Sequence, residues 1–393
     1  SFSNNFYLLL ISLVSAMGGL LFGYDWVVIG GAKPFYEIFF AIENSPGMQG
    51  WVMGSAILGC LIGVTIAGSL SDKYGRKPLM IIAAITFTVS AIGTGAVNDL
   101  NWFIFYRIFG GIGIGIASNL SPMYIAEVSP SHVRGKFVSI NQLTIVLGIL
   151  AAQFVNWLIA EPVVPGENIL ETWNGQMGWR WMFWAEVVPS ALFFILIFFI
   201  PESPRWLATK LQYGKAENIL SHIGGKEYAK KEIESIKTVI SATKEKLNIR
   251  MLFQGKIPGI LLIGIVIAAF QQWCGLNVVF NYAQEIFAAA GYGVSDILFN
   301  IVVTGVTNVI FTFVGMYTVD KLGRRSLMLF GASGLAIIYI IMGICYYLNI
   351  TGMAVLIMVV LAIACYAMTL APVTWVVLSE IFPNRIRGMA MAV

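Results

Sequence analysis

The chain has 393 residues, of which 58% are hydrophobic and only 11% are charged, and its mean hydropathy is +0.81. Soluble proteins carry charge on roughly a quarter of their residues, so this composition excludes a soluble globular protein. The formal net charge of +4 is too small to indicate a nucleic-acid partner.

Apolar runs of about twenty residues, each long enough to cross a bilayer as a helix, recur along most of the chain. Alternating strand patterns are absent, so the expected class is an all-α polytopic membrane protein. Ten spans are expected, at residues 6–29, 49–70, 78–97, 102–122, 138–159, 181–200, 257–284, 297–319, 326–348 and 353–378.

The basic residues lie on one side of these spans. Every Lys and Arg except Lys33, Arg107 and Arg180 falls after the second, fourth, sixth or eighth span, or in the tail of the chain. By the positive-inside rule these segments and the N-terminus are cytoplasmic. We therefore expect a multi-pass protein of the cell membrane, inner or plasma, with a cytoplasmic N-terminus.

The first span contains an acidic residue, Asp25, at the end of the stretch GGLLFGYD. A carboxylate at such a depth costs roughly 2.5–3.5 kcal/mol on insertion scales. With these span boundaries, Arg107 in the fourth span is the only basic residue inside the membrane, and the topology places both residues in the outer half. Because each charge would be costly alone, we predict that Asp25 and Arg107 pair.

Residues 201–256 form the one polar region, which is rich in Lys and Glu. The apolar positions of KEYAKKEIESIKTVISATKEKL recur with helical spacing, which favours short amphipathic helices on the cytoplasmic face, and a flexible charged linker is the alternative. The expected organisation is an N-terminal half, 1–200, this linker, and a C-terminal half, 257–393.

Two motifs occur once in each half. GSLSDKYGRKPLM (68–80) matches YTVDKLGRRSLM (317–328), and MYIAEVSPSHVRGK (123–136) matches WVVLSEIFPNRIRGM (375–389). Two different motifs repeated at a matched spacing indicate two homologous halves of parallel topology. Each half should then hold six spans. The second half has four before Val393, so we expect ten of twelve helices and a truncated chain.

These motifs place opposite charges at the cytoplasmic ends of helices. We expect the charges to pair across neighbouring helices and across the two halves, closing the inner side with partly solvated pairs worth about 1 kcal/mol each. The alternative, that they only fix the topology, explains the arginines but not the matching acids. The candidate gate residues are Asp72, Arg76, Glu127, Arg134, Glu202 and Arg205 in the first half, and Asp320, Arg324, Glu380 and Arg387 in the second.

The amides of the fifth and seventh spans suggest a ligand. Gln142 and Gln153 are about three helical turns apart and share a face of the fifth span with Asn156. A polar stripe in a membrane helix faces the protein interior or a water-filled cavity. In QQWCGLN of the seventh span, Gly275 could loosen the helix and let the amides converge. Uncharged amides both donate and accept hydrogen bonds, which suits a neutral hydroxylated ligand.

Further stretches complete the pattern, namely GGLLFGYD (18–25), YRIFGGIGIG (106–115), PESPRW (201–206), QQWCGLN (271–277), APVTW (371–375) and SEIFPNRIRG (379–388). Over essentially the whole chain they resemble the sugar porters of the major facilitator superfamily, and most closely the bacterial proton–xylose symporters. PESPRW together with the doubled D-x-x-G-R-[KR] motif is what makes the resemblance specific. It implies the major facilitator fold and transport by alternating access.

The resemblance also implies the residues that bind a monosaccharide. Phe22 and Trp375 would present apolar faces to the sugar, and Pro372 is expected to break the tenth span beside Trp375. For each amide, the alternative is a hydrogen bond between helices that holds the bundle together. Asn281 and Ala371 depart from the family pattern near the expected pocket and bear on which sugar fits. The implied amides are Gln142, Gln271, Gln272, Asn277 and Asn308.

The resemblance favours proton coupling at Asp25, because proton-coupled members carry an acid at this position. A change in hydration would let Asp25 take up a proton and release Arg107. The expected function is therefore a proton-coupled symporter of a xylose- or glucose-like monosaccharide. A facilitative uniporter with a structural ion pair is the first alternative, and a sugar sensor that does not transport is the second.

Other functional classes are disfavoured. Catalytic motifs such as a P-loop or H-E-x-x-H are absent, so an enzyme is not expected, and PESPRW and QQWCGLN argue against a drug or phosphate antiporter. The four cysteines lie in apolar spans without C-x-x-C spacing, and the two histidines lie far apart. We therefore expect no metal and no cofactor. The expected partners are a neutral monosaccharide, protons and the lipid bilayer, with the protein a monomer.

Overall fold

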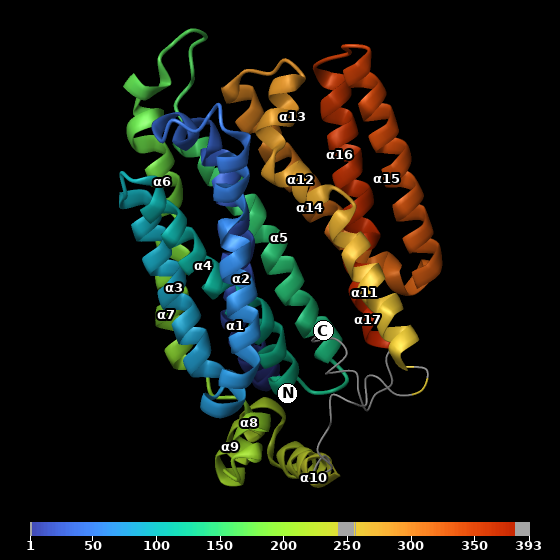
Figure 1. Ribbon diagram of the computed structural model, residues 1–393. Helices are drawn as coiled ribbons and strands as arrows, with labels where there is room; N and C mark the ends of the chain where they lie inside the picture. The colour runs from blue at the N-terminus through green and yellow to red at the C-terminus, as the bar shows by residue number, and fades with distance from the viewer. Residues whose placement is uncertain (1, 243–254, 256, 382–393) are drawn as a thin grey trace. The chain divides into compact units, whose positions relative to one another are not determined.

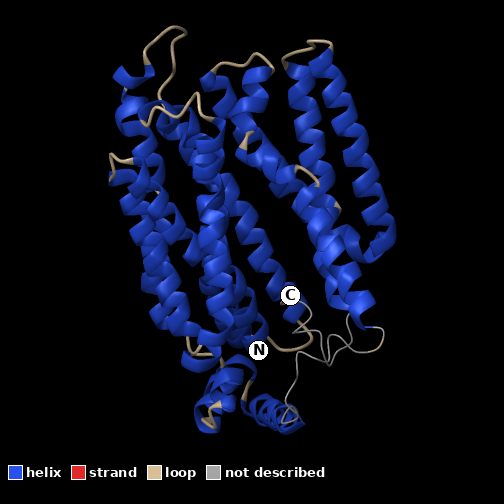
Figure 2. Ribbon diagram, viewed as in Figure 1, coloured by secondary structure: helices blue, strands red, loops and turns tan. Residues whose placement is uncertain are grey.

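The computed structural model describes residues 2–242, 255 and 257–381, without the side chains of residues 2–5, 239–242, 320 and 379 (Figure 1). Within these ranges every regular element is a helix, and Figure 2 shows helices joined by loops. Ten helical segments are long and apolar enough to cross a membrane, as the sequence predicts. The chain divides into two compact units, Ser1–Ala242 and Thr243–Val393.

The first unit holds six of these candidate spans. The first five are α1 (Phe2–Phe39), α2 (Pro46–Tyr74), α3 (Arg76–Ala96), α4 (Leu100–Val128) and α5 (Arg134–Ile159). After a short 3-10 turn, η1 (Ile169–Glu171), the sixth span is made of four consecutive pieces. These are the π-helical turn η2 (Asn174–Gly178), α6 (Trp179–Trp184), α7 (Val187–Leu196) and the 3-10 turn η3 (Ile197–Phe199).

The first span is longer than the sequence predicts. Residue 29 was the expected end, but α1 continues through Lys33 and Pro34 to Phe39. Lys33 is 0% exposed, and its Nζ lies 3.7 Å from a carboxylate oxygen of Glu37, one helical turn further on. Gln49 of α2 donates to the other Glu37 oxygen at 3.2 Å. The prediction that Arg107 is the only basic residue within a span is therefore wrong, because a nearby acid allows Lys33 to be buried.

Small residues let the helices of the first unit approach closely. A Cβ atom built on Gly59 of α2 would lie 1.9 Å from the carbonyl oxygen of Ile108 in α4. On the facing helix, a Cβ atom on Gly111 would lie 2.1 Å from the carbonyl oxygen of Ala56. The glycines of the GGIGIG stretch thus permit direct contact between helix backbones, which is the usual role of small residues in membrane bundles.

Three short helices follow the sixth span and belong to the same unit: α8 (Pro204–Thr209), α9 (Tyr213–Gly224) and α10 (Lys226–Ala242). They pack on one another through an apolar cluster that includes Leu207, Leu220 and Ile233. In Figure 1 they lie below the membrane-spanning helices of this unit, where α8 contacts α4 and α9 contacts α1. The functional division at residues 200 and 256 stays a prediction.

The second unit contains the other four candidate spans. Its helices are α11 (Ile257–Trp273), α12 (Leu276–Asn281), α13 (Ala283–Ala289), α14 (Val294–Leu322), α15 (Arg324–Tyr347), α16 (Met353–Met368) and α17 (Leu370–Ile381). The seventh span breaks at Gly275, as the sequence predicts, because its φ of 89° lies in the left-handed region that glycine favours.

The tenth span breaks near Pro372, slightly earlier than expected. α16 ends at Met368 and α17 begins at Leu370. Proline has no N–H group, so Pro372 cannot donate to the carbonyl of Met368 four residues before it. The lost hydrogen bond accounts for a break one turn before the proline rather than at the proline itself.

Candidate functional site

The first unit contains a buried ion pair between α1 and α4. Asp25 and Arg107 are each 1% exposed. The Nη1 group of Arg107 donates to the Asp25 carboxylate, and its Nη2 group donates to the backbone carbonyl of Asp25 at 3.2 Å. One guanidinium therefore holds both the side chain and the main chain of a single residue. The structure brings together the two residues for which the sequence predicts a pair.

A second carboxylate, which the sequence analysis missed, joins this pair. Glu186 lies between α6 and α7, is 1% exposed, and interacts electrostatically with both Asp25 and Arg107. With both carboxylates ionised the buried cluster would carry an uncompensated negative charge, and binding a proton removes it. The sequence did contain a signal for Glu186, because this acid lies within the predicted sixth span, at residues 181–200.

Not every polar atom of this cluster is hydrogen-bonded. Asp25 Oδ2, Glu186 Oε1 and Arg107 Nε are buried and have no hydrogen-bond partner among the residues that the structure describes. Buried polar atoms normally find partners, and exceptions concentrate where a proton, a water molecule or a moving group is used. The cluster thus has spare donor and acceptor capacity at the centre of the unit.

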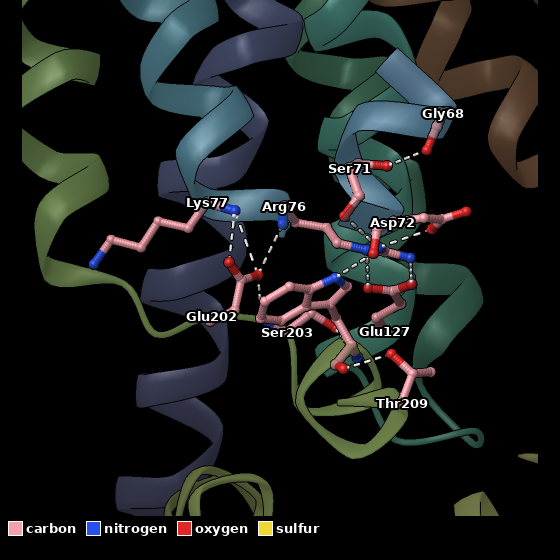
Figure 3. Close-up of polar contacts among 10 residues, drawn as sticks. Gly68, Ser71, Asp72, Arg76, Lys77, Glu127, Glu202, Ser203 and Thr209 are labelled. Carbon is pink, nitrogen blue, oxygen red and sulfur yellow. Dashed lines mark hydrogen bonds and ion pairs between the residues drawn. The ribbon is translucent and has the colours of Figure 1, made fainter. Parts of the chain in front are cut away.

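A second charged cluster lies where α2, α3 and α4 meet, and we call Asp72, Arg76, Glu127 and Glu202 the A cluster. Arg76 Nε and Nη2 donate to the two carboxylate oxygens of Glu127 at 3.0 and 2.9 Å, and its Nη1 donates to Asp72 at 3.1 Å. Figure 3 shows the three side chains converging from these helices. The bidentate arrangement is the strong form of an Arg–carboxylate contact.

Glu202 completes the A cluster by capping α3. Its carboxylate accepts from the backbone N–H groups of Arg76 at 3.0 Å and Lys77 at 3.2 Å (Figure 3). These groups lie in the first turn of α3, where N–H groups have no partner within the helix. Burial raises the pKa of Glu202, and its hydrogen bonds with the backbone of Ser203, Arg76 and Lys77 partly offset that rise. Arg134 and Arg205 bond elsewhere, with the carbonyl of Ser129 at 3.4 Å and the carboxylate of Glu232 at 3.8 Å respectively.

The second unit repeats the A cluster in part. Arg324 donates to Glu380 at 3.0 Å and to the carbonyl of Val319 at 3.3 Å, as Arg76 donates to Glu127 and to the carbonyl of Ser71. The preceding glycines both have positive φ, 105° at position 75 and 81° at position 323. Two of the predicted gate residues cannot be placed, because the side chain of Asp320 and the whole of Arg387 lie outside the described residues.

Amides converge in the second unit at the break in the seventh span. Asn277 donates to Gln272 at 2.8 Å, Gln272 donates to Gln271 at 2.8 Å, and Gln271 donates to the Tyr366 hydroxyl at 2.6 Å. Gln272 is exposed and Asn277 is half-buried, so both can reach a ligand. Tyr366, on α16, was not predicted, because only the tertiary packing of α16, which contacts α12, brings its hydroxyl to Gln271.

The other predicted sugar-binding residues are placed without contacts that assign a role. In the first unit, Phe22 and Gln142 are half-buried, and Phe22 lies edge-on to Trp26 with ring centroids 6.2 Å apart. In the second unit, Asn308 is buried and Trp375 is 53% exposed. Their roles stay predictions.

The fifth-span stripe is split between two environments. Asn156 donates to the carbonyl of Val28 in α1 at 3.0 Å, so this amide forms the interhelical bond that was the alternative to a ligand contact. Gln153 is buried, and neither of its amide atoms has a hydrogen-bond partner among the described residues.

A family model described as "Sugar (and other) transporter" matches residues 11–393. The chain belongs to this sugar transporter family. Among its relatives, the D-xylose-proton symporter of Escherichia coli K12 is 39% identical over 414 residues, which cover 99% of this chain and 82% of the relative. The arabinose-proton symporter of Bacillus subtilis is 37% identical and the glucose facilitated diffusion protein of Zymomonas mobilis 32%, each covering 98% of this chain and 82% of the relative.

Solved structures of sugar transporters match the fold. The xylose transporter XylE of E. coli, in a partially occluded inward open conformation, gives a TM-score of 0.83 at 35% identity, covering 98% of this chain and 90% of that one. XylE bound to 6-bromo-6-deoxy-D-glucose gives 0.82 at 38% identity, covering 99% and 85%. That structure is described as a major facilitator superfamily proton:xylose symporter, so the predicted fold class is confirmed.

Proposed function

We propose that the protein is a proton-coupled monosaccharide symporter of the cell membrane that works by alternating access, with its N-terminus in the cytoplasm. The observation that carries the proposal is the buried cluster of Asp25, Arg107 and Glu186, which has two acids for one base. Relatives whose names include proton symport of xylose and of arabinose support the same function. No catalytic step is proposed for it.

In the proposed cycle, the cluster changes its internal pairing when it binds a proton. With Asp25 ionised, Arg107 is held by both the side chain and the backbone of α1. A proton on Asp25 neutralises the carboxylate, and Arg107 is then freed to pair with Glu186. Because these residues lie on α1, α4 and the α6–α7 junction, the exchange changes which helices are tied together, and so biases one conformation over another.

The proposed sugar site consists of Phe22, Gln142, Gln271, Gln272, Asn277, Asn308 and Trp375. Of these, the bonded series from Asn277 to Gln271 offers the clearest support, because a sugar hydroxyl can replace one amide in such a series and still find both donors and acceptors. The amides carry no charge, which suits a neutral ligand. The protein is proposed to act as a monomer.

The proposed cytoplasmic gate consists of the predicted charged residues, with the A cluster as its best supported part. Arg76 joins α3 to α2 and α4, and Glu202 joins α3 to the segment that leads into α8. Breaking these contacts would release the helix ends on this side, and making them would hold those ends together. Asp72, whose side chain is 76% exposed, forms the partly solvated contact that suits forming and breaking in every cycle.

A reconstituted uptake assay tests the function. Radiolabelled xylose and glucose are offered to proteoliposomes with and without an imposed inward proton gradient. A gradient of one pH unit supports about tenfold accumulation when one proton accompanies each sugar. Asp25→Asn should abolish accumulation while downhill exchange survives. Glu43→Gln is the control, because it neutralises an exposed acid shortly after α1, leaves the buried ion pairs intact and should still accumulate sugar.

The second candidate is a facilitative uniporter, which the 32% identical glucose facilitated diffusion protein favours. In a uniporter the buried cluster would be purely structural. Equilibration without accumulation in the wild-type protein would establish this candidate and reject symport. Accumulation that survives in Asp25→Asn would keep symport but remove Asp25 from the coupling step.

A further inference from the structure

The first unit has an open surface pocket, which we call the cavity, at the end opposite the A cluster. Its volume is about 420 Å³, and it lies between the last turn of α3 and the start of the sixth span, which contact each other in Figure 1. The residues that line it include Asn98, Gln176, Arg180 and Trp184, with Phe39 at the end of α1. None of the proposed coupling, gate or sugar-binding residues lines this cavity.

Arg180 is the one charged group of this cavity, and it is only 7% exposed. Its guanidinium carbon lies 4.9 Å from the ring centroid of Phe39 and 4.4 Å from that of Trp179, and these two rings also contact each other, with centroids 5.4 Å apart. The two rings help to bury the guanidinium, and its N–H groups bind polar partners.

The acceptors around Arg180 are all uncharged. Its Nη1 donates to the carbonyls of Gly95 at 2.8 Å and Val97 at 2.7 Å, its Nε to the carbonyl of Gln176 at 3.0 Å, and its Nη2 to Oδ1 of Asn98 at 2.7 Å. A guanidinium has five N–H groups, so one N–H of Nη2 is left over. No carboxylate among the described residues forms an ion pair with Arg180. The positive charge is buried, uncompensated, and has a donor to spare beside a cavity.

Exposed tryptophans indicate that the cavity lies at the level of the lipid headgroups. Three exposed tryptophans lie in the first two turns of the helices that begin at this end: Trp51 of α2, Trp102 of α4 and Trp181 of α6. Tryptophan is enriched at membrane–water interfaces, where its ring is apolar and its N–H group is wet. The phosphate groups at this level of a bilayer are those of phospholipid headgroups, so the position favours a phospholipid as the ligand.

The rim of this end favours a headgroup that also carries a positive charge. The exposed charged residues of its three connecting loops are all acidic, namely Glu43, Asp99, Glu161, Glu167 and Glu171. Asp99 follows Asn98 directly, beside the cavity. A purely anionic headgroup would be repelled by this rim, whereas an amine bound to the phosphate would be attracted to it.

We propose that this cavity binds the headgroup of an aminophospholipid, with its phosphate on the free edge of Arg180 and its ammonium toward the acidic rim. Arg180 also caps the last carbonyls of α3, and that structural role accounts for its hydrogen bonds with Gly95 and Val97. Capping does not require a cavity beside the guanidinium or a charge without a counter-ion. A phosphate supplies both the missing acceptor and the missing charge.

The sharpest variant is Asn98→Asp. It keeps the oxygen that accepts from Arg180 and adds a carboxylate that neutralises the guanidinium. If Arg180 were only a cap, the variant would leave lipid binding unchanged. If the cavity is a phosphate site, Asn98→Asp removes its attraction for the headgroup while the fold is retained. Asn101→Asp is the matched control, because it adds the same charge to the same surface without lining the cavity.

The measurement is native mass spectrometry of the delipidated full-length protein titrated with phosphatidylethanolamine or phosphatidylglycerol. The thermal unfolding temperature of each variant is measured in parallel. We expect the wild-type protein to prefer phosphatidylethanolamine. Asn98→Asp should weaken that binding at least about tenfold without lowering the unfolding temperature, and Asn101→Asp should not. Unchanged binding in Asn98→Asp, or a preference for phosphatidylglycerol, would overturn the proposal. Inorganic phosphate that stabilises the wild-type protein but not Asn98→Asp would assign the site to a soluble anion and overturn the lipid.

Discussion

The two halves repeat an Arg–Glu contact, and the repeats are predicted to differ in strength. In the first unit the contact between Arg76 and Glu127 is bidentate, and the side chains are 10% and 14% exposed. In the second unit, Arg324 makes one bond to Glu380 at 3.0 Å, and the side chains are 33% and 52% exposed. Water screens the second contact far more than the first, so equal sequence motifs should give unequal coupling energies.

The magnitudes follow from that geometry. A buried, bidentate hydrogen bond between charged groups contributes about 1.5–3 kcal/mol, whereas exposed ion pairs contribute about 0.2–1 kcal/mol. A double-mutant cycle measures the coupling free energy between the Arg and the Glu of each pair. One cycle combines Arg76→Gln with Glu127→Gln, and the matched cycle combines Arg324→Gln with Glu380→Gln. The assay is the free energy of unfolding in mixed micelles under conditions where refolding is reversible.

The first cycle should give the larger coupling energy by at least about 1 kcal/mol. Equal values, or a larger value in the second unit, would refute the inference from burial and geometry to strength. The outcome matters for the gate, because the sequence motifs alone predict about 1 kcal/mol for every pair alike. A stronger contact in the first unit would mean that the two repeated contacts need different free energies to break.

Two further predictions concern stability. Because burial raises the pKa of Glu202, the folded protein binds this proton more tightly than the unfolded chain, and the contribution of Glu202 to stability is largest at low pH and falls as the pH rises through the folded pKa. The free energy of unfolding of Glu202→Gln, relative to wild type, should therefore rise as the pH increases above 4.5, the ordinary pKa of a glutamate, and a flat difference would contradict this. Gly59→Ala should destabilise the protein by about 1–3 kcal/mol, because its Cβ would lie 1.9 Å from the carbonyl oxygen of Ile108. Gly54→Ala, with nothing within 4 Å, is the control, and equal losses in both would show that helix contact is not the cause.

Several features of the fold were predictable because they rest on local energetics. The number of spans follows from the length of apolar runs, since a helix that crosses the bilayer needs about twenty apolar residues. The break at Gly275 follows from the conformational freedom of glycine beside polar residues. The repeat of the D-x-x-G-R-[KR] turns predicts the same backbone at both positions, and Gly75 and Gly323 have the same sign of φ.

The errors lie where a residue depends on a partner far away in the sequence. Lys33 looked like the end of the first span, yet it is buried beside the Glu37 carboxylate, which also accepts a hydrogen bond from Gln49. Glu186 was overlooked because one acid hardly changes the hydropathy of its span. The role of Arg205 in the gate stays a prediction, and its carboxylate partner, Glu232 of α10, was not foreseen.

From the sequence alone follow the spans and the need of Asp25 for a basic partner, since both are set by the cost of placing given atoms in a lipid bilayer. The repeat and the family resemblance also follow from the sequence, because they rest on matched motifs. The tertiary structure decided which atoms meet. Only the packing of α1, α4 and the α6–α7 junction makes a cluster of three charges from an expected pair. Only the end of α3, the start of the sixth span and Phe39 together leave Arg180 buried without a counter-charge. Such contacts depend on the angles and registers at which helices pack, and hydropathy does not encode these.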